Sequence, residues 1–208
     1  MIANQRLAFV LLTLSTTATL NAEIIDFGLV SGDFTSSFTQ GSFTVGVAPS
    51  NTMAAADLDR DDVATFSSLP SNIAAFANST SGTGVLRVTR STGGSLFSFD
   101  GVDMGAFGST PNTVSLTGFF GGFSVGTDSF TPTASGSAYD SFAASALSGL
   151  TLDALDIDFG SLSGAADIVA VDNLDLTLVA SAAVPEPSSF ACLLLGGIGL
   201  YARRRRRS

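Results

Sequence analysis

The chain has 208 residues, contains no His and no Lys, and carries a formal net charge of −9 at pH 7. This length allows one domain with processing segments at its ends. The absence of His excludes Ser-His-Asp triads and His-ligated metal centres, and the absence of Lys excludes Schiff bases and Ser-Lys pairs. The only cysteine, Cys192, lies in an apolar run near the C-terminus, so the rest of the chain has no thiol nucleophile and no disulfide. This inventory argues against an enzyme.

The first 22 residues are typical of a secretory signal peptide. Arg6 precedes the apolar run Leu7–Leu14, and a Ser/Thr/Ala-rich stretch follows up to Ala22. This order predicts export through the Sec machinery and cleavage after Ala22. The apolar run is too short to span a bilayer, which takes about 20 apolar residues. The alternative is an ordinary N-terminal core segment.

Residues 23–184 have the pattern of an all-β domain. Short apolar runs alternate with polar residues and are separated by Gly, Ser and Asn turns, as in an antiparallel β-sandwich. The strands are expected at Ile24–Leu29, Ser42–Val47, Leu86–Thr89, Phe97–Asp100, Thr113–Thr117, Gly122–Val125, Leu155–Phe159 and Asp175–Val179. Fifteen of the 17 Phe lie in this region, and in the absence of Trp we expect them to fill the core. The Ala-containing stretch Asn51–Asn78 predicts a short helix or a long loop.

The middle region is strongly acidic. It keeps only three basic residues, Arg60, Arg87 and Arg90, against nearly all of the 18 acidic residues. Such a domain repels nucleic acid and anionic membrane surfaces, and it suits divalent cations.

Asp172 is a candidate ligand for a structural calcium ion. If Ile168–Val179 is one unbroken strand, Asp172 lies on the same face as its apolar residues. A buried carboxylate costs several kcal/mol unless it is paired, hydrogen-bonded or bound to a metal. Asp26 or Glu23, near the first strand, would be its partner. The alternative is a bulge at Asp172-Asn173 that changes the facing of the side chains.

Two further groups of carboxylates are candidates for a calcium site and for a catalytic pair, and in each case solvated carboxylates are the competing interpretation. Asp57, Asp59, Asp61 and Asp62 form the densest acidic cluster, but the Gly and Glu of an EF-hand loop are missing. The cluster therefore predicts a solvated loop, with a looser calcium site as the alternative. Asp156 and Asp158 are the only candidate pair for glycoside hydrolysis, and a solvated strand face is the competing interpretation.

The C-terminus combines three elements. Pro185, Glu186 and Pro187 precede an apolar stretch that ends at Ala202. Five arginines follow: Arg203, Arg204, Arg205, Arg206 and Arg207. As a helix, residues 188–202 would cover about 22 Å, which is short for a hydrocarbon core of about 30 Å unless the arginines extend the span. The Arg cluster predicts a single-pass segment with its C-terminus in the cytoplasm and the domain outside the inner membrane.

The order of a Pro-Glu-Pro motif, an apolar stretch and a terminal Arg cluster resembles the PEP-CTERM sorting domain. Such domains occur on exported proteins of Gram-negative bacteria that make exopolysaccharide. The resemblance implies recognition by an exosortase, cleavage near Pro185–Pro187, and release or attachment of the upstream domain. A plain C-terminal anchor is the alternative. More loosely, Leu86–Phe99, Val114–Gly118 and Ala170–Leu176 resemble the jelly-roll cargo domains of such proteins, which are similar to carbohydrate-binding sandwiches.

The sequence thus predicts an all-β, jelly-roll-like sandwich at residues 23–184, between a signal peptide at 1–22 and a sorting signal at 185–208. We expect a non-catalytic cell-surface or extracellular protein, associated with exopolysaccharide and in transient contact with the inner membrane. Two alternatives are a carbohydrate-binding module, for which Tyr139 is the only Trp or Tyr outside the tail, and a secreted carboxylate-dependent hydrolase.

Overall fold

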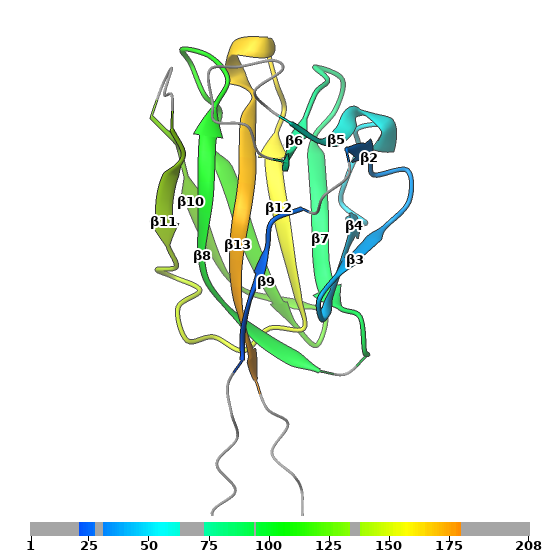
Figure 1. Ribbon diagram of the computed structural model, residues 1–208, viewed down its shortest axis with the longest axis vertical. Helices are drawn as coiled ribbons and strands as arrows, with labels where there is room; N and C mark the ends of the chain where they lie inside the picture. Colours follow the sequence, from blue (N-terminus) through cyan, green and yellow to red (C-terminus); the bar gives the residue numbers. More distant parts are fainter. Residues whose placement is uncertain (1–20, 28–30, 63–72, 94, 134–137, 180–208) are drawn as a thin grey trace, which may run out of the picture.

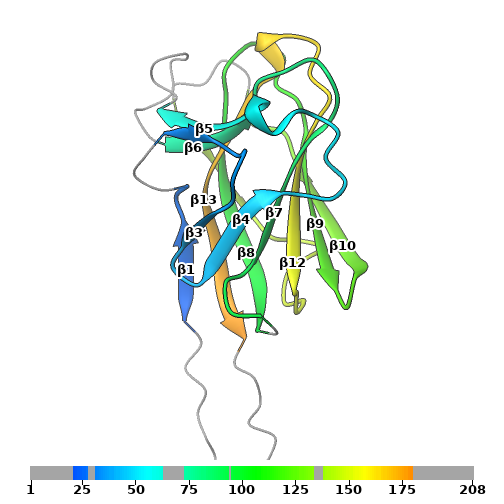
Figure 2. The same ribbon diagram turned by 90° about the vertical axis from the view of Figure 1, so that its right-hand side faces the viewer.

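The computed structural model describes residues 21–27, 31–62, 73–93, 95–133 and 138–179. Within them the protein is all-β, with two antiparallel sheets that face each other as a sandwich (Figures 1 and 2). The expected all-β sandwich is therefore confirmed. The predicted signal peptide up to Leu20 and the whole sorting signal lie outside the described residues.

The first sheet has seven strands in the order β11-β8-β13-β6-β5-β2, and β1 pairs with β13 beside this path. Its strands are β1 (Ala22–Ile25), β2 (Gly32–Asp33), β5 (Leu58–Asp62), β6 (Ile73–Ala77), β8 (Leu96–Ala106), β11 (Asp140–Ala143) and β13 (Val169–Val179). The long strands β8 and β13 form its centre, and they pair from Val169↔Ala106 to Val179↔Leu96.

The second sheet has six strands in the order β10-β9-β12-β7-β4-β3. They are β3 (Phe38–Gln40), β4 (Phe43–Val47), β7 (Gly84–Arg90), β9 (Val114–Phe120), β10 (Phe123–Phe130) and β12 (Ala154–Gly160). β9 alternates as half-buried strands do, with Val114 and Leu116 fully buried, whereas β12 is buried on both faces from Ala154 to Ile157.

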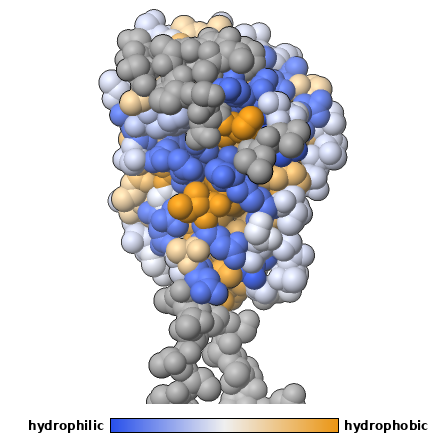
Figure 3. Space-filling view, in the orientation of Figure 1, coloured by the Kyte–Doolittle hydropathy of each residue, from blue (hydrophilic) through white to orange (hydrophobic). Residues whose placement is uncertain are grey.

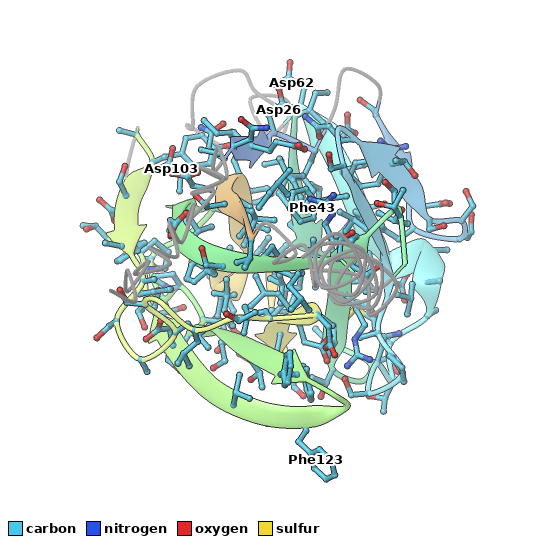
Figure 4. The ribbon with its side chains drawn as sticks, turned by 90° about the horizontal axis from the view of Figure 1, so that it is seen from below. Asp26, Phe43, Asp62, Asp103 and Phe123 are labelled. Atoms are coloured by element: carbon cyan, nitrogen blue, oxygen red, sulfur yellow. The ribbon has the colours of Figure 1, made fainter. Side chains whose placement is uncertain are left out.

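Phenylalanines fill the space between the sheets, as expected. Phe43 of β4 and Phe97 of β8 are both 0% exposed, and their rings meet edge to face at 5.3 Å between centroids. One ring comes from each sheet, so this contact joins the two layers. In the view along the domain axis, Phe43 lies in the interior (Figure 4).

The expectation for Asn51–Asn78 is only partly right. A short 3₁₀ helix, η1 (Ala55–Asp57), is present, but β5 and β6 follow it and pair with each other from Leu58↔Ala77 to Asp62↔Ile73. The alanines of β6 are buried, and β7 comes close to the last of them: a Cβ on Gly84 would lie 2.8 Å from the Cβ of Ala77. The expected strand Ile24–Leu29 ends earlier, at Ile25.

The domain has two poles at opposite ends of its long axis. β1 begins and β13 ends side by side, with Ala22 opposite Thr177, at the end that we call the proximal pole (Figure 1). The other end, where the 3₁₀ helix η3 (Ala165–Asp167) leads into β13, is the distal pole. Because β13 has 11 residues, the two poles lie about 33 Å apart.

Candidate functional site

A pocket of about 420 Å³ opens at the distal pole. Four segments contribute to it: β5, the end of β6 with Asn78, the turn after β8, and η3 with the residue that follows it. Its lining residues are Asp59, Asp61, Phe76, Asn78, Phe107, Gly108, Ala165, Ala166 and Ile168. We call it the distal pocket.

The walls of the distal pocket combine aromatic and hydrogen-bonding groups. The rings of Phe76 and Phe107 lie 5.1 Å apart between centroids, and Phe107 is the more accessible of the two. Asn78 donates from Nδ2 to Oδ2 of Asp59 at 3.5 Å. An aromatic surface with carboxylate and amide groups beside it can hold a ring that carries hydroxyl groups.

The acidic strand β5 gives the pocket its charge. Burial raises the pKa of Asp59, against the hydrogen bond from Asn78, and the nearby charges of Asp33, Asp61 and Asp57 raise it further. The expectation of a solvated loop at the Asp57–Asp62 cluster is wrong, because Leu58–Asp62 is a strand paired on both sides. Its alternation places Asp59 and Asp61 together in the pocket wall.

One carboxylate fixes the turn that carries η3. Asp167 accepts hydrogen bonds from the backbone N–H of Ser163 at 2.8 Å, from the hydroxyl of the same residue, and from Oγ1 of Thr110 at 3.0 Å. These bonds, that of the Ser163 hydroxyl most of all, lower the pKa of Asp167. Gly108 is required beside this turn, because a Cβ there would lie 2.4 Å from Cα of Ala166.

Of the candidate calcium ligands, Asp172 lies in β13, and Asp26 directly follows β1, which pairs with β13. Asp172 is fully buried, and Asn173 after it has a positive φ of 44°. The pairing of β13 with β8 shifts register here, so the expected alternative of a bulge is present. Asp26 accepts a hydrogen bond from Nε2 of Gln40. Glu23 accepts the backbone N–H of Ser42 through Oε2 at 2.7 Å. Among the described residues, no group of three or more His, Cys, Asp or Glu is placed to hold a metal ion.

Tyr139 is not an exposed platform for a sugar ring. It is half-buried and packs against the core. Burial raises the pKa of its hydroxyl, and the negative charges of Asp172, Asp62 and Asp103 raise it further. Asp62 and Asp103 lie on the same side of the domain as Asp26 in Figure 4. Phe107 is partly buried against the core as well, but its ring lines the distal pocket, and no sequence pattern distinguishes it from the other phenylalanines.

Asp156 is part of an ion pair. Arg87 donates from Nε and Nη2 to its two carboxylate oxygens at 2.6 and 2.8 Å. The hydrogen bond to Asp156 raises the pKa of Arg87, against burial, and the guanidinium also lies over the ring of Phe119. The expected solvated strand face is thus wrong for Asp156, which is 5% exposed. Asp158 accepts the backbone N–H of Gly160 at 2.8 Å. The bidentate contact with Arg87 occupies both carboxylate oxygens of Asp156.

The sorting residues Pro185, Glu186, Pro187 and Arg203–Arg207 lie outside the described residues, and so does the apolar stretch between them. Within the described part, no helix is long and apolar enough to cross a bilayer. The family model of the PEP-CTERM protein-sorting motif matches residues 183–207. The chain carries a PEP-CTERM sorting motif at its C-terminus. This motif implies an exported, cell-surface-associated protein that is processed by an exosortase. None of the curated proteins compared with the chain matches it.

Proposed function

We propose that this PEP-CTERM protein is a non-catalytic component of the cell surface or extracellular matrix, associated with exopolysaccharide. It is exported by the Sec machinery with its signal peptide removed, passes through a single-pass intermediate whose C-terminus is cytoplasmic, and is then processed by exosortase. The proposal includes a short transmembrane helix and a jelly-roll-like order of strands. The sorting motif at residues 183–207 is the observation that carries it.

The arrangement of the domain supports this route. β1 starts at Ala22, and Leu178 donates its backbone N–H to the carbonyl of Asn21 at 2.9 Å. Cleavage after Ala22 would leave the pairs from Glu23↔Leu176 to Ile25↔Leu174 in place, so the domain keeps its first strand after processing. Both chain ends leave from the proximal pole, which suits a domain attached to one membrane through both of them (Figure 1).

The intact mass of the protein from its native host tests this function, with cell-bound and secreted fractions measured separately. We expect a chain that starts at Glu23 and ends near Pro185–Pro187. A mass that still includes Arg203–Arg207 in both fractions would contradict exosortase processing and indicate a plain anchor.

A second candidate function, carbohydrate binding, is favoured by the distal pocket. Phe107 supplies a partly exposed aromatic wall, and Asp59, Asp61 and Asn78 supply hydrogen-bonding groups. Because the pocket is acidic, neutral or amino sugars fit it, whereas uronic acids are repelled. We expect the full-length protein to be retained on neutral or amino polysaccharides.

A matched pair of variants tests the pocket. Phe107→Ala removes one ring of the Phe76–Phe107 pair in the pocket, and Phe142→Ala removes one ring of the Phe130–Phe142 pair elsewhere. Loss of retention in the first variant alone supports carbohydrate binding by the pocket. Equal retention by both variants, or retention on uronate polymers only, contradicts it.

A further inference from the structure

The turn between β9 and β10 holds two phenylalanine rings out into solvent. Gly121 and Gly122 both have positive φ, 60° and 82°, as a two-residue turn with its strands in register requires. Phe120 and Phe123 flank the turn and face each other across the two strands. Asp153 accepts the backbone N–H of Gly121 at 2.6 Å. The rings therefore project from a turn of fixed geometry.

This hairpin is the most exposed apolar feature of the described residues. Phe123 is 78% exposed, Phe120 48% and Val125 40%. In the view from below, Phe123 points away from the rest of the domain (Figure 4). A shallow hollow beside it is lined by Leu96, Phe120, Val125, Leu150 and Thr151, none of which is charged. By contrast, the face of the domain in Figure 3 is largely hydrophilic, with small separate apolar areas. We call the hairpin and the hollow the apolar tip.

The apolar tip lies at the proximal pole, where the chain leaves the domain in both directions. Val179, the last residue of β13, pairs with Leu96 of β8. The next residue of β8, Phe97, pairs with Leu152. Asp153, next to Leu152, donates its backbone N–H to the carbonyl of Phe119. Three adjacent contacts thus connect the end of β13 to the Phe120–Phe123 turn.

The sequence beyond β13 indicates what this pole faces. Ten residues, 180–189, separate Val179 from the apolar stretch that begins at Phe190. Even when fully extended, ten residues reach no more than about 35 Å. Before processing, the proximal pole is therefore held close to the bilayer into which the sorting segment inserts.

We propose that the apolar tip is a membrane-contact loop that seats the proximal pole on the bilayer surface. Phe side chains, like those of Trp and Leu, bury at the boundary between headgroups and acyl chains, and exposed apolar patches commonly mark such contacts. Because the domain is acidic, anionic headgroups do not attract it electrostatically. Its contact with the bilayer therefore has to be made by uncharged, apolar side chains. Two rings are enough because the attached tail makes the contact intramolecular.

The contact gives the domain a defined orientation on the membrane. With the apolar tip on the bilayer, the distal pocket opens about 33 Å away, on the side of the extracellular polymer. The same seating holds the Pro185–Pro187 segment close to the membrane, where an exosortase acts. The inference rests on the proposed function, because the sorting segment is what brings this pole to the bilayer.

The experiment uses the fact that the chain contains no Trp. Phe123→Trp places the single tryptophan of the variant in the apolar tip, and its emission can be excited apart from that of the two tyrosines. Ser109→Trp is the matched control, an exposed position just beyond β8 at the distal pole. Each full-length variant is incorporated into phosphatidylcholine vesicles, floated through a density gradient, and measured with and without brominated acyl chains. We expect the Phe123→Trp emission to shift to the blue and to be quenched by bromine, and the Ser109→Trp emission to do neither.

Three other results would contradict the inference, and each of them points to a different cause. If both variants float and neither is quenched, the tail anchors the protein but the tip does not touch the bilayer. If neither variant floats, the anchoring on which the inference rests is itself wrong. A blue shift that also appears in detergent and grows with protein concentration would assign the tip to contact with a second copy.

Discussion

The two poles of this sandwich differ in surface chemistry, one acidic and the other apolar, although the same strands run between them. The distal pole carries Asp57, Asp59, Asp61, Asp62 and Asp167 around a pocket with an aromatic wall. At the proximal pole both chain ends emerge beside the exposed Phe120 and Phe123. The difference fits the two proposals made above, in which the proximal pole contacts the membrane and the distal pole presents a binding site. If the poles are independent, a substitution at one should leave the other unchanged.

The largest effect is expected from the layer between the poles. Phe97→Ala removes a ring that is 0% exposed and in contact with Phe43 of the other sheet, so we expect a loss of about 3–5 kcal/mol in the free energy of unfolding. Phe123→Ala removes the same side chain from a site that is 78% exposed, and we expect a change within about 0.5 kcal/mol. Urea unfolding of both variants measures the contrast. Similar losses in the two would mean that the apolar tip is part of the core.

A smaller but substantial effect is expected at Asp128. This carboxylate, 5% exposed, accepts the backbone N–H groups of Ser145, Ala146 and Leu147 at 2.7–3.1 Å. Asp128→Ala leaves these donors without their acceptor, so we expect a loss of about 2 kcal/mol or more. The turn that it fixes leads to Leu150 in the apolar tip.

The control for Asp128 is Asp100→Ala, which removes two exposed hydrogen bonds, from Thr177 at 2.6 Å and from Ser98 at 3.5 Å. We expect a change of about 0.5 kcal/mol or less. Hydrogen exchange of residues 145–150 locates the effect: it should increase in Asp128→Ala alone. Unchanged exchange there would show that the turn is held by its apolar contacts.

The sequence predicted the body of the domain better than either pole. Strands such as β12 follow from apolar residues that recur with a period of two in the sequence, which is a local signal. The phenylalanine core follows from the absence of Trp, which is a signal of composition. β6 was missed because its alanines suggest a helix, whereas in the structure they are buried in a strand and Ala77 lies close to Gly84. The bulge at Asn173 was one of two alternatives, since a single positive φ has no signature in the pattern of apolar residues.

The distal pocket could not be predicted for a different reason. Its walls come from four segments that are distant in sequence, and only the pairing of β5 with β6 brings Asp59 beside Phe76. The alternation in Leu58–Asp62 was the one available signal that Asp59 and Asp61 share a face. The sorting signal, by contrast, is read as a linear segment, so its residues needed no fold to be found.

Two carboxylates at the distal pole should respond to pH in opposite directions. Hydrogen bonds, chiefly from the hydroxyl of Ser163, hold the pKa of Asp167 below its usual range. Its contribution to stability is therefore present above the unfolded pKa of about 3.8 and lost as the pH falls through the lower folded value. We expect Asp167→Asn to lower the melting temperature at pH 7, with the difference shrinking in acid. A difference that stays constant from pH 7 to pH 2 would show that these bonds do not depend on the charge.

The smallest effect is expected at Asp59, whose pKa burial raises. Here the folded state binds the proton more tightly than the unfolded state, so the stability from protonation is present below pH 3.8 and lost as the pH rises through the higher folded value. Asp59→Asn removes the cost of the charge, and we expect a gain of less than about 1 kcal/mol at pH 7 that disappears at low pH, since the site is only partly buried. Melting temperatures between pH 3 and pH 7 measure it. If Asp59→Asn is stabilising at neutral pH but loses retention on polysaccharide, the partly buried carboxylate belongs to the distal site; if both stability and retention are unchanged, the pocket does not depend on its charge.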